Sequence, residues 1–394
     1  MAKIQTRGRK SLGRRAKKCQ QNNGEPSGAE GGRARTSPHA VLFEFLRERI
    51  PEYRELIELR EEGWANPTAD DHFERERANA DHASSQGKER FYTMTCNIGN
   101  ELDRATGGAL TFNLPKHQRL AVLDLGMAPG GFTTAALTHN RFVSAYGISL
   151  PVNMGGYEIR MPRWRTDQRI VSIRFLDITM LATEMGVDIE TEIPATHPDA
   201  GRFLDERPFL DQTFDLVFCG GTVVRNHERS EYREGCERTR LVTSQLVLAF
   251  NRIRPGGTLV LVMRRADSEV SVEMMHRFSK FADIQLFKPG KAHARKSSFY
   301  MVAQNVQSES LEAAQAVKLW KKKWREVTLG RDVSDEMEVL SPDSNSDRLS
   351  ADGMESLLAE FGERLVELTR PVFKTQANAL RTAPWRTKKD STYL

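Results

Sequence analysis

Residues 120–132 read Leu120-Ala-Val-Leu-Asp-Leu-Gly-Met-Ala-Pro-Gly-Gly-Phe132. An apolar strand ends here in an acidic residue and a glycine-rich turn that opens a helix. The glycines of this turn allow backbone conformations closed to other residues and let a ligand approach the main chain closely. Asp124 stands at the carboxyl end of the strand, where open α/β sheets bind their ligands. The run therefore predicts an α/β fold with a ligand at this turn.

The glycine spacing differs from the dinucleotide fingerprint G-x-G-x-x-G. It reads D-x-G-x-A-P-G-G-F and resembles the S-adenosylmethionine (SAM) loop of the FtsJ-like (RrmJ) family of RNA ribose 2′-O-methyltransferases. The resemblance covers roughly residues 89–305, about half of the chain. Two other interpretations stay open, because glycine-rich turns are common in such sheets: a Rossmann-type turn that holds no SAM, and a purely structural turn.

Strands and helices alternate after Leu120, which predicts a mostly parallel, seven-stranded sheet covered on both faces. The strand candidates are residues 121–125, 142–148, 170–175, 214–219, 258–263, 284–287 and 299–303. A helix over 237–252 ends before the turn Arg254-Pro-Gly-Gly257. This order is that of a Rossmann-like SAM methyltransferase. Residues 178–212 are rich in prolines and acids and predict an excursion from the sheet.

Composition narrows the class of protein. The 394 residues are 39% hydrophobic, enough for one large core. No stretch approaches the roughly 20 apolar residues of a membrane span, and no apolar core of a secretory signal stands at the N-terminus. The cysteines lack the paired C-x-x-C spacing of zinc sites, so we expect reduced intracellular thiols and no metal. They are Cys19, Cys96, Cys219 and Cys236.

Residues 1–38 are expected to form a disordered basic arm, since they hold almost no large apolar residues. They contain ten basic and two acidic side chains, a net charge of +8, whereas the whole chain carries +5. The rest of the chain is therefore slightly acidic. The arm is open to three interpretations: a nuclear or RNA-contacting segment, a mitochondrial presequence, or a merely solvated tail. A cytoplasmic location is also compatible with it.

Two helical extensions are predicted to flank the central domain. Residues 39–88 begin with two short helices separated at Pro51, expected to pack against the sheet domain, and continue as a polar linker or helix. Residues 306–394 contain a basic helix around Lys318–Arg325, an acidic linker over 341–347 and a final helix over 354–368. Trp320 and Trp324 of the basic helix could stack on RNA. The alternative is a capping helix with buried tryptophans.

The resemblance implies a set of cofactor-binding residues. In the SAM loop these are Asp124, Gly126, Ala128, Pro129, Gly130, Gly131 and Phe132. After the second strand, where the family holds the cofactor ribose, Ile148 or Ser149 stands where an acid is usual. Asp177 ends the third strand and matches the acid that contacts the adenine amino group. A simple cap of the strand end is the alternative role for Asp177.

The family's catalytic lysine, aspartate, lysine and glutamate have no counterpart here. The corresponding positions are held by Thr93 or an adjacent residue, Gly220, Val262 with Arg264 and Arg265 slightly beyond it, and Ser298. Arg264 could stabilise a developing alkoxide, although an arginine cannot release a proton. His227, after the fourth strand, is a candidate base. A solvent-exposed loop histidine without a catalytic role is the alternative.

The sequence thus predicts a SAM-dependent methyltransferase that acts on an RNA ribose 2′-hydroxyl, with an rRNA-type substrate. RNA would be bound through the basic arm and the Lys318–Arg325 helix. Two alternatives remain. The missing catalytic set favours a SAM-binding scaffold for RNA or protein that has lost catalysis, and the slightly acidic body favours a methyltransferase for small molecules.

Overall fold

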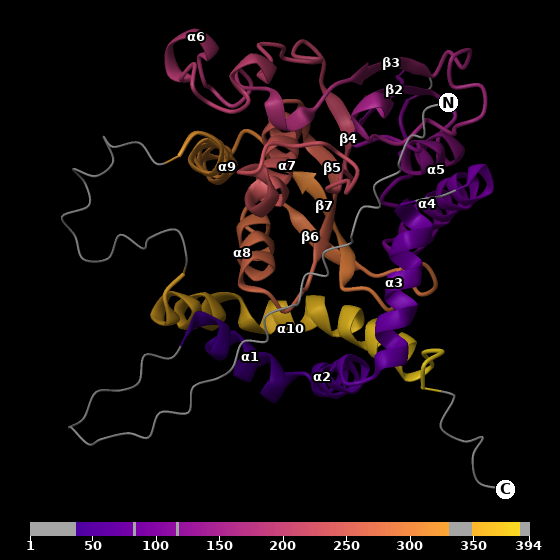
Figure 1. Ribbon diagram of the computed structural model, residues 1–394, viewed down its shortest axis with the longest axis vertical. Coiled ribbons are helices and arrows are strands. Elements are labelled where there is room, and N and C mark those ends of the chain that lie inside the picture. Colours follow the sequence, from indigo (N-terminus) through magenta and orange to yellow (C-terminus); the bar gives the residue numbers. More distant parts are fainter. Residues whose placement is uncertain (1–36, 82–83, 116–117, 331–348, 387–394) are drawn as a thin grey trace, which may run out of the picture. The chain divides into compact units, whose positions relative to one another are not determined.

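The computed structural model describes residues 37–81, 84–115, 118–330 and 349–386. Among these residues, seven strands form one sheet in the order β3-β2-β1-β4-β5-β7-β6 (Figure 1). The strands are β1 (Leu120–Leu125), β2 (Val143–Ser149), β3 (Ile170–Phe175), β4 (Phe214–Cys219), β5 (Ile253–Arg264), β6 (Asp283–Phe287) and β7 (Ser298–Val306). Strands β1 to β5 are parallel, and β7 is antiparallel to β5 and β6. The predicted α/β class and all seven predicted strands are confirmed.

The order of the strands reverses at β1. The chain runs outward from β1 through β2 to β3, then returns to place β4 on the other side of β1. Helix α5 (Gly131–His139) connects β1 to β2, and α7 (Arg233–Phe250) connects β4 to β5. Ligands of open α/β sheets bind at such a reversal, outside the carboxyl ends of the strands. The glycine turn after β1 lies at this point.

Helices cover both faces of the sheet. On one face, α4 (Ser85–Ala105) and α5 share an apolar core with Val122, Phe218 and Val260. On the other, α7 and α8 (Glu269–Phe278) pack on Leu123, Val217 and Leu259. Alternate residues of each strand therefore point to opposite cores.

Helix α9 (Leu311–Leu329) packs against α7 and resolves one of the open interpretations. Trp320 and Trp324 are 4% and 0% exposed, and the Trp324 indole N–H donates to the Thr179 carbonyl oxygen at 3.1 Å. Buried rings cannot stack on RNA, so that role for the two tryptophans was wrong and the capping-helix alternative is confirmed. Lys318 and Lys322 stay exposed on the outer face of the helix.

The terminal helices pack mainly on one another. Helices α1 (Pro38–Arg49) and α2 (Pro51–Trp64) contact α10 (Ala351–Arg381) far more than the sheet itself (Figure 1). They also meet the sheet domain, since α1 contacts α8 and Arg60 of α2 donates to Asp267 after β5 at 2.7 Å, as predicted. Helix α10 also runs well past its predicted end at Leu368. Pro371 removes one backbone hydrogen bond, but Val372, Phe373 and Leu380 beyond it are buried, and this packing carries the helix through.

The segments that connect the main elements contain a further α-helix and several short helical turns. In the stretch predicted as a polar linker or helix, residues 67–81 form α3 (Pro67–Asp81) and residues 85–88 begin α4. The excursion after β3 contains only η2 (Ile178–Met180), α6 (Ile189–Glu192) and η3 (Ala200–Arg202). In the described part of the chain, no helix combines the length and apolar character that a membrane crossing requires. The acidic stretch over 341–347 and nearly all of the basic arm lie outside the described residues, and Pro38 is already helical.

Candidate active site

The glycine turn brings the ends of β1 and β4 into close contact. Gly126 and Gly130 adopt φ angles of +90° and +103°, which favour glycine. A Cβ atom on Gly126 would collide with the Cα atom of Gly221, just after β4. Gln245 of α7 holds this second turn, because its side-chain oxygen accepts the Gly221 N–H at 2.8 Å and its amide donates to the Gly221 carbonyl at 3.2 Å.

Asp124 is 2% exposed at the end of β1. Its carboxylate accepts a hydrogen bond from the Thr133 hydroxyl of α5 at 2.7 Å. Burial raises the pKa of Asp124 to about 6, because a charged carboxylate is poorly solvated there. A ligand that donates hydrogen bonds or carries a positive charge would relieve this penalty.

Two further glycines set α4 against the turn. A Cβ atom on Gly99 would lie 2.6 Å from that of Ala135, and one on Gly131 would collide with the Thr95 hydroxyl. Only glycine lets α4 cross α5 this closely. This contact places Thr95 beside the glycine turn, whereas Thr93, the predicted counterpart of a family lysine, is exposed on another face of α4.

The last two residues of β2 point to opposite faces of the sheet. Ile148 is 1% exposed and belongs to the main apolar core, whereas Ser149 ends the strand. Ser149 is therefore the residue available where the family usually has an acid. The space at Gly220, after β4, is open, since a Cβ atom there would meet only the Phe132 ring at 4.0 Å. These features fit SAM, and the fitting residues are Asp124, Gly126, Ser149 and Gly220.

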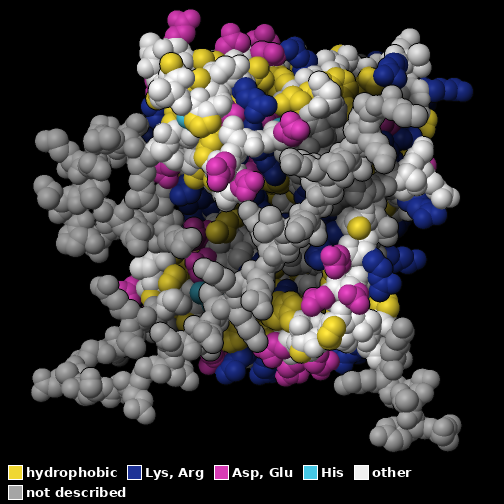
Figure 2. Space-filling model, in the orientation of Figure 1, with side chains coloured by type: hydrophobic (Ala, Val, Ile, Leu, Met, Phe, Trp, Pro, Cys, Tyr) yellow, Lys and Arg dark blue, Asp and Glu magenta, His cyan; other side chains and the backbone are white. Residues whose placement is uncertain are grey.

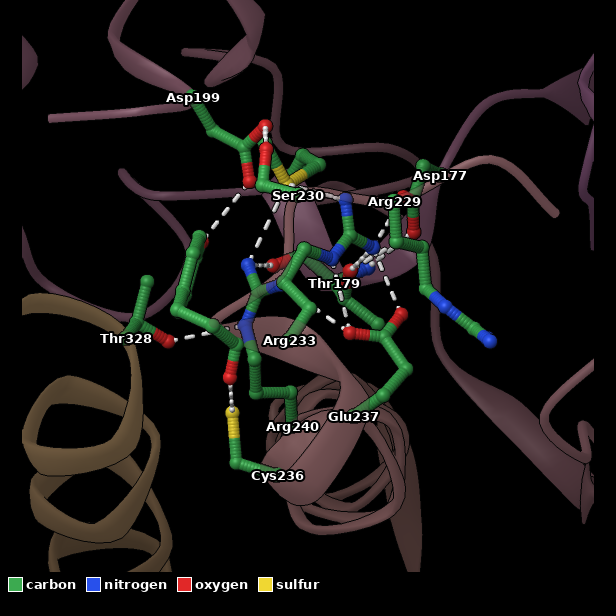
Figure 3. Close-up of polar contacts among 12 residues, drawn as sticks. Asp177, Thr179, Asp199, Arg229, Ser230, Arg233, Cys236, Glu237, Arg240 and Thr328 are labelled. Carbon is green, nitrogen blue, oxygen red and sulfur yellow. Dashed lines mark hydrogen bonds and ion pairs between the residues drawn. The ribbon is translucent and has the colours of Figure 1, made fainter. Parts of the chain in front are cut away.

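Asp177 lies in a buried polar network that the sequence did not reveal (Figure 3). One carboxylate oxygen accepts from the Thr179 N–H at 3.0 Å, and the other accepts from Arg233 of α7 at 2.8 Å. Arg233 also donates to Glu237 at 2.6 Å. Burial opposes the ionisation of Asp177, but Arg233 outweighs it and holds the pKa of the carboxyl below its usual range. Asp177 thus caps the strand end and anchors α7, in addition to its predicted role toward adenine.

His227 lies against the same network and is 8% exposed, so the interpretation as a solvent-exposed histidine was wrong. Its Nε2 atom is 3.5 Å from an Asp177 carboxylate oxygen and forms no hydrogen bond within the described part of the chain. Burial lowers the pKa of His227, against the opposing charge of Asp177. Asp177, His227 and Glu237 have the spacing of metal ligands. However, the Arg233 guanidinium already bridges the two carboxylates, which disfavours a metal there.

Positions of the missing catalytic set lie at the carboxyl ends of the parallel strands. Gly220 follows β4, Arg264 ends β5, and Ser298 begins β7 directly opposite Arg264. Strand alternation places Arg264 on the face of Val262, which packs in the core of α4 and α5. Burial and nearby Arg238 lower the pKa of Arg264. His227 lies at the β3 end, about 19 Å away by strand spacing, so the two predicted catalytic side chains do not share a site.

An open polar pocket of about 880 Å³ lies between α4 and the loop that leads into β7. One wall is a face of α4, and the other is the loop between β6 and β7. The α4 residues are Gln86, Glu89, Arg90, Thr93, Met94, Asn97, Ile98, Asn100, Glu101 and Arg104, and the loop adds Lys291 and Ala292. The pocket therefore combines amide, basic, acidic and apolar groups next to Thr93.

A buried lysine shapes the loop wall of this pocket. Lys288 is 7% exposed, and its ammonium group donates to the carbonyl oxygens of His293, Lys296 and Ser298 at 3.2, 2.6 and 2.8 Å. Burial and nearby Arg60 lower the pKa of Lys288 to about 7. Three donors used on three carbonyls hold the loop in one conformation.

Lys288→Met should loosen this loop. It leaves three carbonyls without their donor, so we expect a loss of about 2–3 kcal/mol in the free energy of unfolding. Hydrogen exchange of residues 289–297 should accelerate. Lys291→Met is the matched control, because Lys291 is exposed in the same loop. Equal exchange rates in the two variants would show that Lys288 does not hold the loop.

Sequence reasoning missed three features of the site. Arg233 and Gln245 act through contacts between distant segments, which no local pattern signals. The third feature was visible: residues 160–169 read Arg-Met-Pro-Arg-Trp-Arg-Thr-Asp-Gln-Arg, with arginines on both sides of Trp164. Of the cysteines, Cys219 is fully buried in β4, which agrees with a core role.

Comparison with known proteins places the chain in a family. The model of the FtsJ-like methyltransferase family matches residues 107–306, half of the chain. No curated protein matches significantly. Similar solved structures include human methyltransferase-like protein 13 in complex with SAH, at 14% identity, a TM-score of 0.33 and coverage of 62% of this chain and 95% of that one.

Two further solved structures are similar. One is an rRNA methylase from Streptococcus thermophilus, at 11% identity, a TM-score of 0.28 and coverage of 48% of this chain and 88% of that one. The other is a SAM-bound amino pentose methyltransferase from Micromonospora echinaspora, at 12% identity, a TM-score of 0.29 and coverage of 59% and 96%. With half of its length matched by the family model, this chain belongs to the FtsJ-like methyltransferase family, whose cofactor is SAM.

Proposed function

We propose that this chain transfers a methyl group to a ribose 2′-hydroxyl of RNA. The observation that carries the proposal is the open polar pocket between α4 and the loop that leads from β6 to Ser298 of β7. Its amide and basic side chains suit a nucleotide, which presents hydrogen-bonding edges and a phosphate. Membership of the FtsJ-like family, which acts on RNA, supports the same substrate.

Bound SAM supplies a methyl group on a positively charged sulfur, which an oxygen nucleophile can attack. The chain's task is then to hold the acceptor hydroxyl in line and to stabilise the negative charge that develops on its oxygen. We assign the second task to Arg264, whose guanidinium stays charged and donates hydrogen bonds. Since Arg264 cannot take the hydroxyl proton, that proton leaves to solvent.

Arg264→Ala should lower the rate of methyl transfer by about 10²–10³-fold and leave SAM affinity unchanged. Transfer of tritiated methyl groups to RNA measures the rate, and calorimetry measures SAM binding. Arg265→Ala is the matched control, because Arg265 pairs with Asp267 instead. If no side chain acts as base, the rate should keep rising above neutral pH. A plateau already reached near pH 7 would instead indicate that a side chain of the chain acts as the base.

A second function is favoured by one observation: none of the family's four catalytic side chains is present at Thr93, Gly220, Val262 or Ser298. The chain could bind SAM and RNA as a scaffold without transfer. Tritiated-methyl transfer onto total RNA, followed by identification of the methylated nucleoside, separates the two. Labelled 2′-O-methyl nucleosides support the enzyme. SAM binding with no label supports the scaffold, and label on small molecules alone would overturn the RNA substrate.

A further inference from the structure

We propose that the loop between β2 and β3 carries a docking surface for single-stranded RNA, centred on Arg163, Trp164 and Arg165. The proposal rests on the proposed function, since it names the surface that would hold the same RNA. It replaces the tryptophans of α9, which are buried, as the aromatic contact.

The backbone of this loop leaves an aromatic surface uncovered. Residues 150–169, all of them described, contain no α-helix, only η1 (Val152–Met154), although parallel strands are usually joined through a helix. Strand β3 lies at the sheet edge, and its Val171 and Phe175 are 51% and 44% exposed. The half-buried Trp164 ring meets Phe175 edge-on, with centroids 6.4 Å apart. Where Figure 1 places β2 and β3, Figure 2 shows hydrophobic and basic side chains interspersed.

The charges around Trp164 are arranged to receive an anion. The neighbouring basic side chains already have acidic partners: Lys88 and Arg160 pair with Glu158, Arg169 with Asp167, and Arg174 with Glu206. Arg163 and Arg165 are exposed and form no ion pair with any residue in the described ranges. The Arg165 guanidinium lies over the Trp164 ring, 4.3 Å from its centroid.

Single-stranded RNA is the partner that uses both the aromatic ring and the exposed arginines of this loop. Proteins bind single strands by stacking bases on aromatic rings and guanidinium planes while cations contact the phosphates. The stacked Trp164 and Arg165 offer a platform for a base, and Arg163 offers a contact for phosphate. Folded double-stranded RNA would use the cations alone.

The same loop contacts both the SAM turn and helix α4 of the candidate active site. The Arg160 N–H donates to the Pro129 carbonyl at 2.9 Å, and the buried Met161 packs against Gly130 of the SAM turn. On the other side, Tyr157 contacts Phe91 of α4 with ring centroids 5.3 Å apart. RNA on this surface would therefore lie beside the cofactor turn and the helix that forms the pocket wall.

Charge reversal tests the surface in the full chain. The probe is a fluorescent single-stranded RNA of about 12 nucleotides, and its affinity is measured by anisotropy at several salt concentrations. Arg163→Glu with Arg165→Glu should weaken binding at least about tenfold and reduce the salt slope by about 0.7, the value for the one phosphate contact assigned to Arg163. Trp164→Leu should weaken binding at least about fivefold with an unchanged slope, because it removes stacking alone.

The matched control is Lys318→Glu with Lys322→Glu on α9, which changes the charge equally and tests the rival surface. We expect its RNA affinity to match the wild type, and SAM titration confirms that each variant is folded. Wild-type RNA binding that survives the Arg163 and Arg165 reversal would overturn this surface and leave the proposed function standing. Wild-type protein that binds SAM but no RNA would overturn both. Binding of phosphatidylserine vesicles in place of RNA would likewise overturn the proposal.

Discussion

Asp124→Asn should lower the affinity for SAM by roughly 100-fold, the loss expected when a charged hydrogen-bond acceptor is neutralised in a buried site. The cofactor-free variant should nevertheless be at least as stable as the wild type near neutral pH. Both effects have one cause, the burial of the Asp124 carboxylate at the end of β1.

The sign of the pH dependence follows from the pKa of Asp124, which is about 6 in the folded chain and 3.8 when exposed. Between these values the folded state binds a proton that the unfolded state lacks, so stability falls as pH rises. Above the folded pKa, ionised Asp124 costs about 3 kcal/mol. Asparagine carries no such cost, so the stability advantage of the variant should appear near pH 7 and vanish near pH 4.

Thermal unfolding across this pH range, with and without SAM, measures both effects. Asp215→Asn is the matched control, because Asp215 is also buried but lies near the start of β4, at the opposite end of the parallel strands from Asp124. We expect no change in its SAM affinity. SAM affinity unchanged in Asp124→Asn would remove this carboxylate from the cofactor site.

Arg233→Met should destabilise the fold by about 3–5 kcal/mol near neutral pH, the second of the large effects. The variant leaves the buried carboxylate of Asp177 without its guanidinium, whereas Glu237 keeps its ion pair with Arg240. Removing one partner of a buried ion pair has a cost of this size, because the remaining charge is neither solvated nor paired. The methionine keeps the length and the apolar contacts of the arginine stem.

The deficit should shrink in acid. In the wild type, Arg233 holds the pKa of Asp177 low, so the stabilisation is present above the unfolded pKa and is lost as pH falls through the folded pKa. Without Arg233, burial raises the pKa of the carboxyl, and protonation then relieves the unpaired charge. Urea unfolding near pH 7 and near pH 4 should therefore show a larger difference between variant and wild type at the higher pH.

Arg202→Met is the control for this experiment, since Arg202 pairs with Asp199 of the same network while its own side chain is 49% exposed. Its loss should stay within about 1 kcal/mol, as for other exposed pairs. Adding Asp177→Asn to Arg233→Met should restore part of the lost stability, because it removes the carboxylate that has lost its guanidinium. A destabilisation no greater than that of Arg202→Met would mean that the buried network contributes little to the fold.

Local sequence determined the sheet and the cofactor turn. Alternating apolar strands and glycine positions depend on neighbouring residues and on backbone conformation, so all seven strands and the turn after β1 could be read from the chain. The basic helix around Lys318–Arg325 could also be predicted from the sequence, but two interpretations of its tryptophans stayed open. Only the packing of α9 against α7 decided that Trp324 is buried rather than exposed to RNA.

Tertiary structure decided which groups share a site. It separated His227 from Arg264, joined Asp177 to Arg233 across 56 positions of sequence, and set Arg264 opposite Ser298. It also left the Arg163-Trp164-Arg165 surface uncovered by a helix. Ion pairs, burial and pKa values depend on distances between segments far apart in the chain, and these distances exist only once the chain is folded.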